Sequence, residues 1–268
     1  GIDISVGSVA AVSGAVAAML IAKAGAPLWL VIVAPVLVAM LIGAWNGLLI
    51  SVVGIQPIIV TLVMLGVGRG AAQLITDGQI INFQNKPFQM IGSGYFLGLP
   101  VSLWMVAVTL VVAGLLLRRT AMGLFIESIG VNQKAAHYSG INTKLIIFVI
   151  YVATAVCAGI AGLIYASDIK AADPNSAGLN TELDAILAVV IGGTSMVDGG
   201  KFTLVGSMIG ALVIQSLTTT ILTMGVPAEF TLVVKALVVF VICMLQSEDF
   251  RNMFGAWVKG LRKGWLDK

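Results

Sequence analysis

The sequence has few charged residues. Lysine, arginine, aspartate and glutamate make up 10% of its 268 residues, against about 25% in an ordinary soluble domain. The hydrophobic fraction is 59%, and the mean hydropathy is +1.06. This balance excludes a soluble globular domain and indicates a membrane protein whose solvent is lipid. The net charge of +3 is small, so we predict no nucleic-acid partner.

Histidine and cysteine are nearly absent. One His and two Cys cannot supply a metal cluster or a His-based catalytic constellation. We therefore predict no metal site and no catalytic residue. Cys157 and Cys243 lie inside apolar runs, which predicts two buried free thiols and no disulfide framework. Residues 195–202, SMVDGGKF, lack two residues of a phosphate-binding loop, so no nucleotide or other cofactor is expected in this chain.

Long apolar runs predict an all-α, polytopic fold with about seven full-length or near-full-length membrane helices, because about 20 residues cross a hydrocarbon core. These runs cover residues 6–24, 27–53, 58–76, 101–117, 144–166, 202–224 and 227–245. Residues 184–193 form a shorter run, followed by a glycine-rich stretch. We predict a half-helix there, with irregular backbone that protein or a water-filled cavity must cover. Residues 1–245 are thus expected to form one transmembrane domain.

Cationic residues predict the topology. Arg118 and Arg119 end one run and Lys144 opens the next, so the polar segment 127–143 between them should lie in the cytoplasm, and residues 77–100 in the periplasm. Residues 246–268 carry apolar side chains at helical spacing among basic ones. They predict an amphipathic tail on the inner leaflet; the alternative is a frayed, solvated end.

Segment 127–143, ESIGVNQKAAHYSGINT, predicts a short docking helix. Asn132 is a good N-cap and Gly140 a good C′ residue, which together bracket about two turns of helix. Two adjacent alanines would give this helix a small face that another protein can approach closely. The alternative is an ordinary polar loop. The candidate contact residues are Asn132, Lys134, Ala135, Ala136, His137, Tyr138 and Gly140.

Polar residues within or beside the apolar runs are candidates for a solute path, because a hydroxyl-rich solute needs donors and acceptors that lipid does not offer. The alternative is that they bond neighbouring helices. The candidates are Asp3, Ser5, Ser8, Asn46, Gln56 and Thr61. Arg69 lies near the outer end of its run and is expected to reach the interface, or else an acidic group on a binding protein.

Lys235 stands near the middle of the last run. A charge there costs at least a few kcal/mol, so it is expected to face protein and to have a partner. Asp184 and Asp198 are the candidate partners. The alternative is a lysine that reaches into a water-filled cavity.

Several motifs occur in the order found in permease subunits of ATP-driven sugar importers. They are GIDISVGS at 1–8, NG at 46–47, QPIIVTL at 56–62, G-x-N…AA…SGI at 130–141, and ELDAI…VIGGTS at 182–195. The chain therefore resembles the ABC permeases for ribose, xylose and galactose-type sugars, and a galactofuranose-type permease in particular. The sequence starts inside one of these motifs, so the family's N-terminal helices are expected to be absent from it.

The resemblance implies a path for a monosaccharide across the bacterial inner membrane, with no catalysis in this chain. A cytoplasmic ABC ATPase, carrying ATP and Mg²⁺, would dock on segment 127–143. A periplasmic sugar-binding protein would deliver the solute, and a second permease subunit, identical or paralogous, would complete the path. Two alternatives remain open. They are an ABC permease for amino acids or nucleosides, and an ion-coupled secondary transporter.

Overall fold

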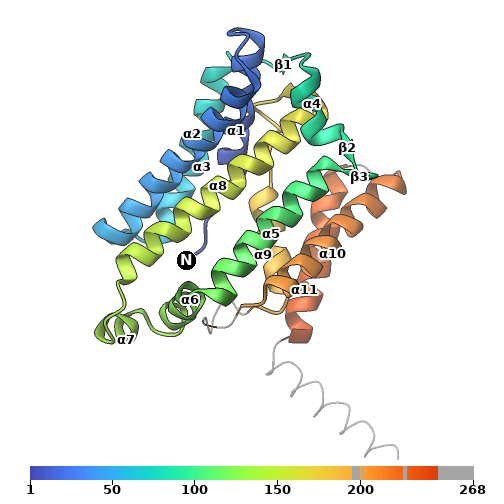
Figure 1. The fold of residues 1–268 in the computed structure, drawn as a ribbon. Coiled ribbons are helices and arrows are strands. Elements are labelled where there is room, and N and C mark those ends of the chain that lie inside the picture. Colours follow the sequence, from blue (N-terminus) through green and yellow to red (C-terminus); the bar gives the residue numbers. More distant parts are fainter. Residues whose placement is uncertain (195–199, 201, 226–227, 247–268) are drawn as a thin grey trace, which may run out of the picture. The chain divides into compact units, whose positions relative to one another are not determined.

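The structure is a computed structural model that describes residues 1–194, 200, 202–225 and 228–246. It forms two compact units, residues 1–183 and 184–268. Helices make up most of the described chain (Figure 1), which confirms the all-α polytopic class. The predicted tail, residues 247–268, and the candidate partner Asp198 lie outside the described residues.

Four long helices form the core of the first unit. They are α1 (Val6–Ala22), α2 (Leu28–Leu48), α3 (Pro57–Ile75) and α8 (Thr143–Ile169). Helix α8 packs along both α1 and α2, and α1 also packs on α3 (Figure 1). Each helix lies within a few residues of its predicted run.

Small residues allow α8 to approach its neighbours closely. A Cβ atom at Gly162 would lie 2.2 Å from the backbone oxygen of Ala10 on α1, and one at Gly43 on α2 would lie 2.5 Å from Cβ of Ala155. The hydroxyl of Ser13 also donates to the Gly159 backbone oxygen at 2.8 Å. Close backbone contact and interhelical hydrogen bonds are the usual means by which helices associate in lipid.

The connection between α2 and α3 has an irregular backbone. Helix α2 continues into a π-helix, η1 (Leu49–Val53), and ends at Gly54, which is left-handed with φ +84°. Helix α3 then begins with Pro57 in its first turn, where the missing N–H would have had no intrahelical partner. The predicted helix start is confirmed, whereas the π-turn was not expected.

The predicted periplasmic interval is folded and not a simple loop. Strand β1 (Ile81–Asn82) pairs antiparallel with β4 (Ala171–Ala172), so Ile81 faces Ala172. Helix α4 (Lys86–Ser93) follows. Phe83 and Phe88 are buried and meet edge to face, with 5.5 Å between ring centroids.

A short hairpin precedes the next long helix. Strands β2 (Tyr95–Phe96) and β3 (Leu99–Pro100) pair and precede α5 (Val101–Arg119). Tyr95 and Phe96 are exposed, as expected for aromatic side chains at a membrane interface.

Two short helices follow α5 at its predicted cytoplasmic end: α6 (Ala121–Val131) and α7 (Gln133–Tyr138). Helix α6 was not predicted, because the apolar run was taken to end at 117 and polar residues begin at 127. The Thr120 hydroxyl accepts from the Met122 backbone N–H and caps α6, a signal that is visible in the sequence.

The second unit contains α9 from Asp184 onward, α10 (Leu204–Thr223) and α11 (Ala228–Gln246). Helix α9 (Thr181–Ile191) has 11 residues, and it starts three residues before the predicted half-helix. A Cβ at Gly210 would lie 1.9 Å from the Ala188 backbone oxygen, so α9 and α10 touch backbone to backbone.

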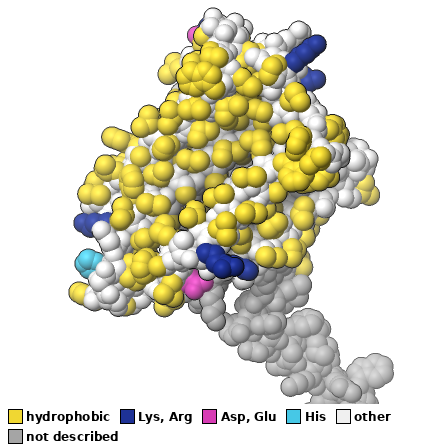
Figure 2. Space-filling view, in the orientation of Figure 1, with side chains coloured by type: hydrophobic (Ala, Val, Ile, Leu, Met, Phe, Trp, Pro, Cys, Tyr) yellow, Lys and Arg dark blue, Asp and Glu magenta, His cyan; other side chains and the backbone are white. Residues whose placement is uncertain are grey.

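Five of the described helices are long and apolar enough to cross a membrane. Hydrophobic side chains cover most of the face drawn in Figure 2, with Lys and Arg toward its ends. Cys157 is free and exposed on α8, so the prediction that it is buried was wrong. A thiol behaves as a small hydrophobe and can therefore lie on an outward face of a membrane helix. The side chain of Cys243 lies outside the described part of the chain.

Candidate functional site

Helix α7 has the predicted caps. The Asn132 Oδ1 atom accepts hydrogen bonds from the backbone N–H groups of Lys134 and Ala135, each at 3.0 Å. Gly140 follows the helix with φ +88°, a left-handed conformation that glycine adopts without strain. The Ile141 N–H then closes the turn on the Ala136 oxygen at 3.1 Å. The start and stop of the helix are therefore confirmed.

The two alanines of α7 face different ways. Ala136 is only 5% exposed, whereas Ala135 is exposed. Helix α7 packs on α6 and on the start of α8, and Ala136 is its one buried residue. The expectation that Ala136 belongs to the free docking face was wrong, because a two-turn helix needs tertiary support. The free face instead carries exposed Lys134, Ala135, His137 and Tyr138.

Four of the predicted path residues meet at the start of α1. The Ser5 hydroxyl donates to Asp3 Oδ1 at 2.7 Å, and Asn46 Nδ2 on α2 donates to Ser5 Oγ at 3.1 Å. The Ser8 hydroxyl donates to the Ser5 backbone oxygen at 2.8 Å. Ser5, Ser8 and Asn46 are at most 1% exposed, so these bonds tie α1 to α2 and replace contacts with water.

The other two path candidates lie apart from this chain of bonds. The Thr61 hydroxyl is fully buried and donates to the Pro57 oxygen on its own helix at 3.0 Å. Gln56 is exposed and, with Asp3, lines a cavity of about 560 Å³. The same cavity is lined by Gln133, Tyr151 and Thr154, which sequence reasoning missed. The signal of Tyr151 and Thr154 was weak, because a hydroxyl inside an apolar run resembles an ordinary helix contact.

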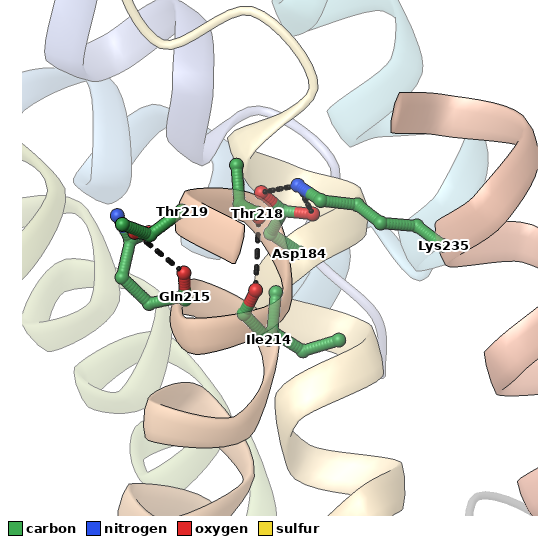
Figure 3. A network of polar contacts seen from close by, with 6 residues as sticks. All are labelled: Asp184, Ile214, Gln215, Thr218, Thr219 and Lys235. Carbon is green, nitrogen blue, oxygen red and sulfur yellow. Dashed lines mark hydrogen bonds and ion pairs between the residues drawn. The ribbon is translucent and has the colours of Figure 1, made fainter. Parts of the chain in front are cut away.

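Lys235 has a carboxylate partner in the second unit. Its Nζ atom lies 2.8 Å from both Oδ1 and Oδ2 of Asp184 on α9 (Figure 3). The side chain of Lys235 is 9% exposed and that of Asp184 is 34% exposed. Asp184 was the first of the two expected partners. Because both carboxylate oxygens are engaged by one ammonium, the pair neutralises a charge inside a membrane helix.

One face of α10 is polar. Thr219 donates to the Gln215 backbone oxygen at 2.9 Å and Thr218 to that of Ile214 at 2.8 Å (Figure 3). Gln215, Ser216, Thr219, Thr220 and Thr223 are all exposed and border one hollow of about 340 Å³. Sequence reasoning overlooked this face, although the spacing of these residues follows a helical period.

Arg69 fixes an irregular segment near the outer end of α3. Its Nη1 atom donates to the backbone oxygens of Pro174 at 3.1 Å and Ala177 at 2.6 Å. Burial raises the pKa of the Asp173 carboxyl, but the backbone N–H groups of Asn175 and Ser176, and the charge on Arg69, lower it more, so the net pKa is below its usual value. This contribution to stability is present above the unfolded pKa and is lost as the pH falls through the folded one.

A bundle of apolar helices with polar residues held inside fits the class of membrane transport permeases. The family model described as branched-chain amino acid transport system, permease component, matches residues 1–243. The chain belongs to this family. The resemblance to permeases of ABC sugar importers is confirmed, and the chain is a multi-pass protein of the bacterial inner membrane.

Three relatives illustrate the similarity. The chain is 46% identical to the galactofuranose transporter permease protein of Escherichia coli K12, over 98% of this chain and 75% of that protein. It is 43% identical to the fructose import permease protein of Bifidobacterium longum, over 94% and 72%. It is 35% identical to the ribose import permease protein of Escherichia coli K12, over 92% and 78%. No solved structure matches the chain significantly.

Proposed function

We propose that this chain lines the path of a pentose or hexose in an ABC importer, and that galactofuranose is the first sugar to test. The observation that carries the proposal is that relatives named for galactofuranose, fructose and ribose import align with more than nine-tenths of the chain. The chain performs no catalysis, and ATP and Mg²⁺ bind to a separate ATPase subunit.

The partners follow from this proposal. A cytoplasmic ABC ATPase docks on the free face of α7, where Lys134, Ala135, His137 and Tyr138 are exposed. A periplasmic sugar-binding protein delivers the solute, and a second permease subunit, identical or paralogous, completes the path. Residues 1–245 make up the transmembrane domain in lipid.

Two observations disfavour the alternatives. The cavity that contains Asp3 and Gln56 has no Lys, Arg or His among the described side chains that line it, so the carboxylate of an amino acid would find no cation there. The relatives named above import sugars through permease proteins, and Lys235 is paired with Asp184 within this chain.

The test is uptake into proteoliposomes that contain the natural protein co-purified with its ATPase and supplied with its binding protein. We expect uptake of radiolabelled galactofuranose, ribose or fructose that requires ATP and continues after ionophores collapse the ion gradients. Leucine should not compete. Uptake that follows the ion gradient without ATP, or uptake of leucine in place of the sugars, would contradict the proposal.

A further inference from the structure

A groove lies between α5 and α8 in the first unit. The two helices run side by side (Figure 1), but the principal packing partners of α5 are α4 and β3 before it and α6 after it. None of the residues of α5 is buried. Two hollows of about 290 and 170 Å³ lie between α5 and α8, and Met105, Thr109 and Ile160 line both of them. The hollows therefore form one continuous groove along the two helices.

The groove offers almost no hydrogen-bonding group to a ligand. Among its described lining residues, Thr109 and Trp104 are the only ones whose side chains carry an oxygen or nitrogen atom. The Thr109 hydroxyl donates to the Met105 backbone oxygen at 2.9 Å, and Trp104 Nε1 donates to the Phe96 backbone oxygen at 3.1 Å. A polar solute would lose its bonds to water in such a groove and gain few in return, so the groove fits a hydrocarbon.

The length of the groove matches one leaflet of a bilayer. On α5 its lining runs from Val101, the first residue of the helix, to Leu110, which is about 14 Å at 1.5 Å per residue. Half of a hydrocarbon core is about 15 Å. A helix of that length, about 10 Å across, needs roughly 1,100 Å³, several times the volume of either hollow. The groove therefore admits an acyl chain and not another helix.

Charged side chains of α8 lie just beyond the groove, at its predicted periplasmic end. Asp168 follows Ile164, which lines the groove, by four residues, so it lies on the same face of α8 about 6 Å nearer that end. Its carboxylate is exposed and has no hydrogen bond or ion pair with any residue that the structure describes. Lys170, the next charged residue, is also exposed. An anion and a cation together complement a zwitterionic headgroup, with the ammonium toward Asp168 and the phosphate toward Lys170.

We propose that the groove between α5 and α8 binds one acyl chain of an aminophospholipid from the periplasmic leaflet, and that Asp168 contacts the ammonium of its headgroup. The lipid fills the space between two helices that are joined mainly at their ends, so it holds α5 against the rest of the unit. This site is independent of the transported solute.

The first test compares two alanines in the facing helices. Both Ala161 on α8 and Ala107 on α5 are exposed, and of the two only Ala161 lines the groove. The natural protein is purified, stripped of lipid and incubated with phosphatidylethanolamine, and native mass spectrometry then measures the lipid retained by each copy. We expect Ala161→Phe, which fills the groove, to lower retention of the first lipid at least fivefold. Ala107→Phe should retain it as the unsubstituted protein does.

Thr109→Phe fills the same groove from α5 and repeats the test should Ala161→Phe fail to fold. Retention of no lipid by the unsubstituted protein, the result expected if another protein segment covers the groove, would overturn the proposal. Equal retention by the groove-filling variants and by Ala107→Phe would do so as well.

The second test concerns the headgroup. Phosphatidylethanolamine and phosphatidylglycerol with identical acyl chains compete for the stripped protein, and we expect the former to be retained at least threefold better. Asp168→Asn should abolish this preference and still retain a lipid, because the groove is intact. Asp77→Asn, at an exposed aspartate beyond α3 that pairs with Lys23, is the control and should keep the preference. Equal retention of the two lipids by the unsubstituted protein, or an unchanged preference in Asp168→Asn, would overturn the assignment of the headgroup.

Discussion

Lys235 keeps its charge inside a membrane helix because Asp184 is within reach. An ammonium in hydrocarbon is costly, and the two 2.8 Å contacts to Asp184 replace the water it has lost. The charges of Lys235 and Asp184 neutralise each other only while both residues are present. Removing one leaves the other charge buried without a counterion, which costs more than the pair itself contributes.

We predict that Lys235→Met lowers the folded amount of the protein and its transport. Loss of one member of a buried pair costs about 3 to 5 kcal/mol, and the partial exposure of Asp184 places the effect at the low end of that range. The double variant Lys235→Met/Asp184→Asn should recover part of the loss. The measurement is thermal stability in detergent, followed by uptake.

The control for this pair is Lys235→Arg, which keeps the charge and should be the mildest of the variants. Asp198, the other candidate partner, provides a second comparison. If Lys235→Met is rescued by Asp198→Asn and not by Asp184→Asn, the Lys235–Asp184 pair is not the one that stabilises the protein.

At the scale of the element, α7 has one face packed against its own chain and one exposed face. Ala136 is buried against α6 and α8, while Ala135 and Tyr138 are exposed. Tyr138 is 87% exposed, which is a large aromatic surface for a six-residue helix. Aromatic side chains of this kind are enriched where proteins bind one another.

We predict that the two alanines respond differently to enlargement. Ala135→Trp should leave the membrane level unchanged and weaken ATPase binding five- to hundredfold, because overpacking a tight contact costs about 1 to 3 kcal/mol. Ala136→Trp should instead displace α7 from its own chain and lower stability as well. The measurement is binding of purified ATPase to membranes at matched expression. Unchanged affinity and uptake for Ala135→Trp would remove α7 from the docking surface.

The contact between α1 and α8 depends on glycine at one position. A Cβ at Gly162 would lie 2.2 Å from the Ala10 backbone oxygen, whereas nothing lies within 4 Å of one at Gly66 on α3. Backbone cannot move aside as a flexible side chain can. The close contact between α1 and α8 therefore requires a glycine at position 162, whereas no contact requires one at position 66.

We predict that Gly162→Ala destabilises the protein by about 1 to 3 kcal/mol, because the added methyl group forces α1 and α8 apart. Gly66→Ala is the matched control and should be neutral or stabilising by up to about 1 kcal/mol, since alanine is the better helix former. Melting temperatures of both variants in the same detergent give the comparison. Equal changes in melting temperature for the two variants would show that the α1–α8 contact has room for the methyl group added at position 162.

At the scale of the whole molecule, the arrangement in the membrane follows from where the cations lie. Arg118 and Arg119 end α5 and Lys144 lies at the start of α8, so the positive-inside rule predicts that α6 and α7 face the cytoplasm. The same rule predicts that the paired strands β1 and β4 and helix α4 lie on the periplasmic side.

We predict that single cysteines at Gln84 and Asn175 are labelled from outside intact spheroplasts by an impermeant maleimide, and that one at Lys134 is labelled only after permeabilisation. All three side chains are exposed, so accessibility of the side chain does not differ between them. Cys157→Ser and Cys243→Ser supply the background. Labelling of Lys134→Cys from outside would reverse the orientation.

The helices and their ends could be read from the sequence because they depend on local properties. Apolar runs of sufficient length predicted α2, α3, α5, α8, α10 and α11 to within a few residues. Asn132 and Gly140 predicted the caps of α7, since the Asn132 side chain bonds N–H groups two and three residues away. Helix α6 was missed because its 11 residues are too few to form a membrane-spanning run, although Thr120 is a visible N-cap.

What the sequence by itself determined is the membrane solvent, the helical class and the family, because composition, run length and motifs are properties of the chain alone. The tertiary structure decided which side of a helix is free. Ala136 is buried and Cys157 exposed, since burial depends on helices that are distant in sequence. It also brought Asp3, Gln56 and Tyr151 to one cavity. These residues are up to 148 positions apart, and only the packing of α1, α3 and α8 places them around the same space.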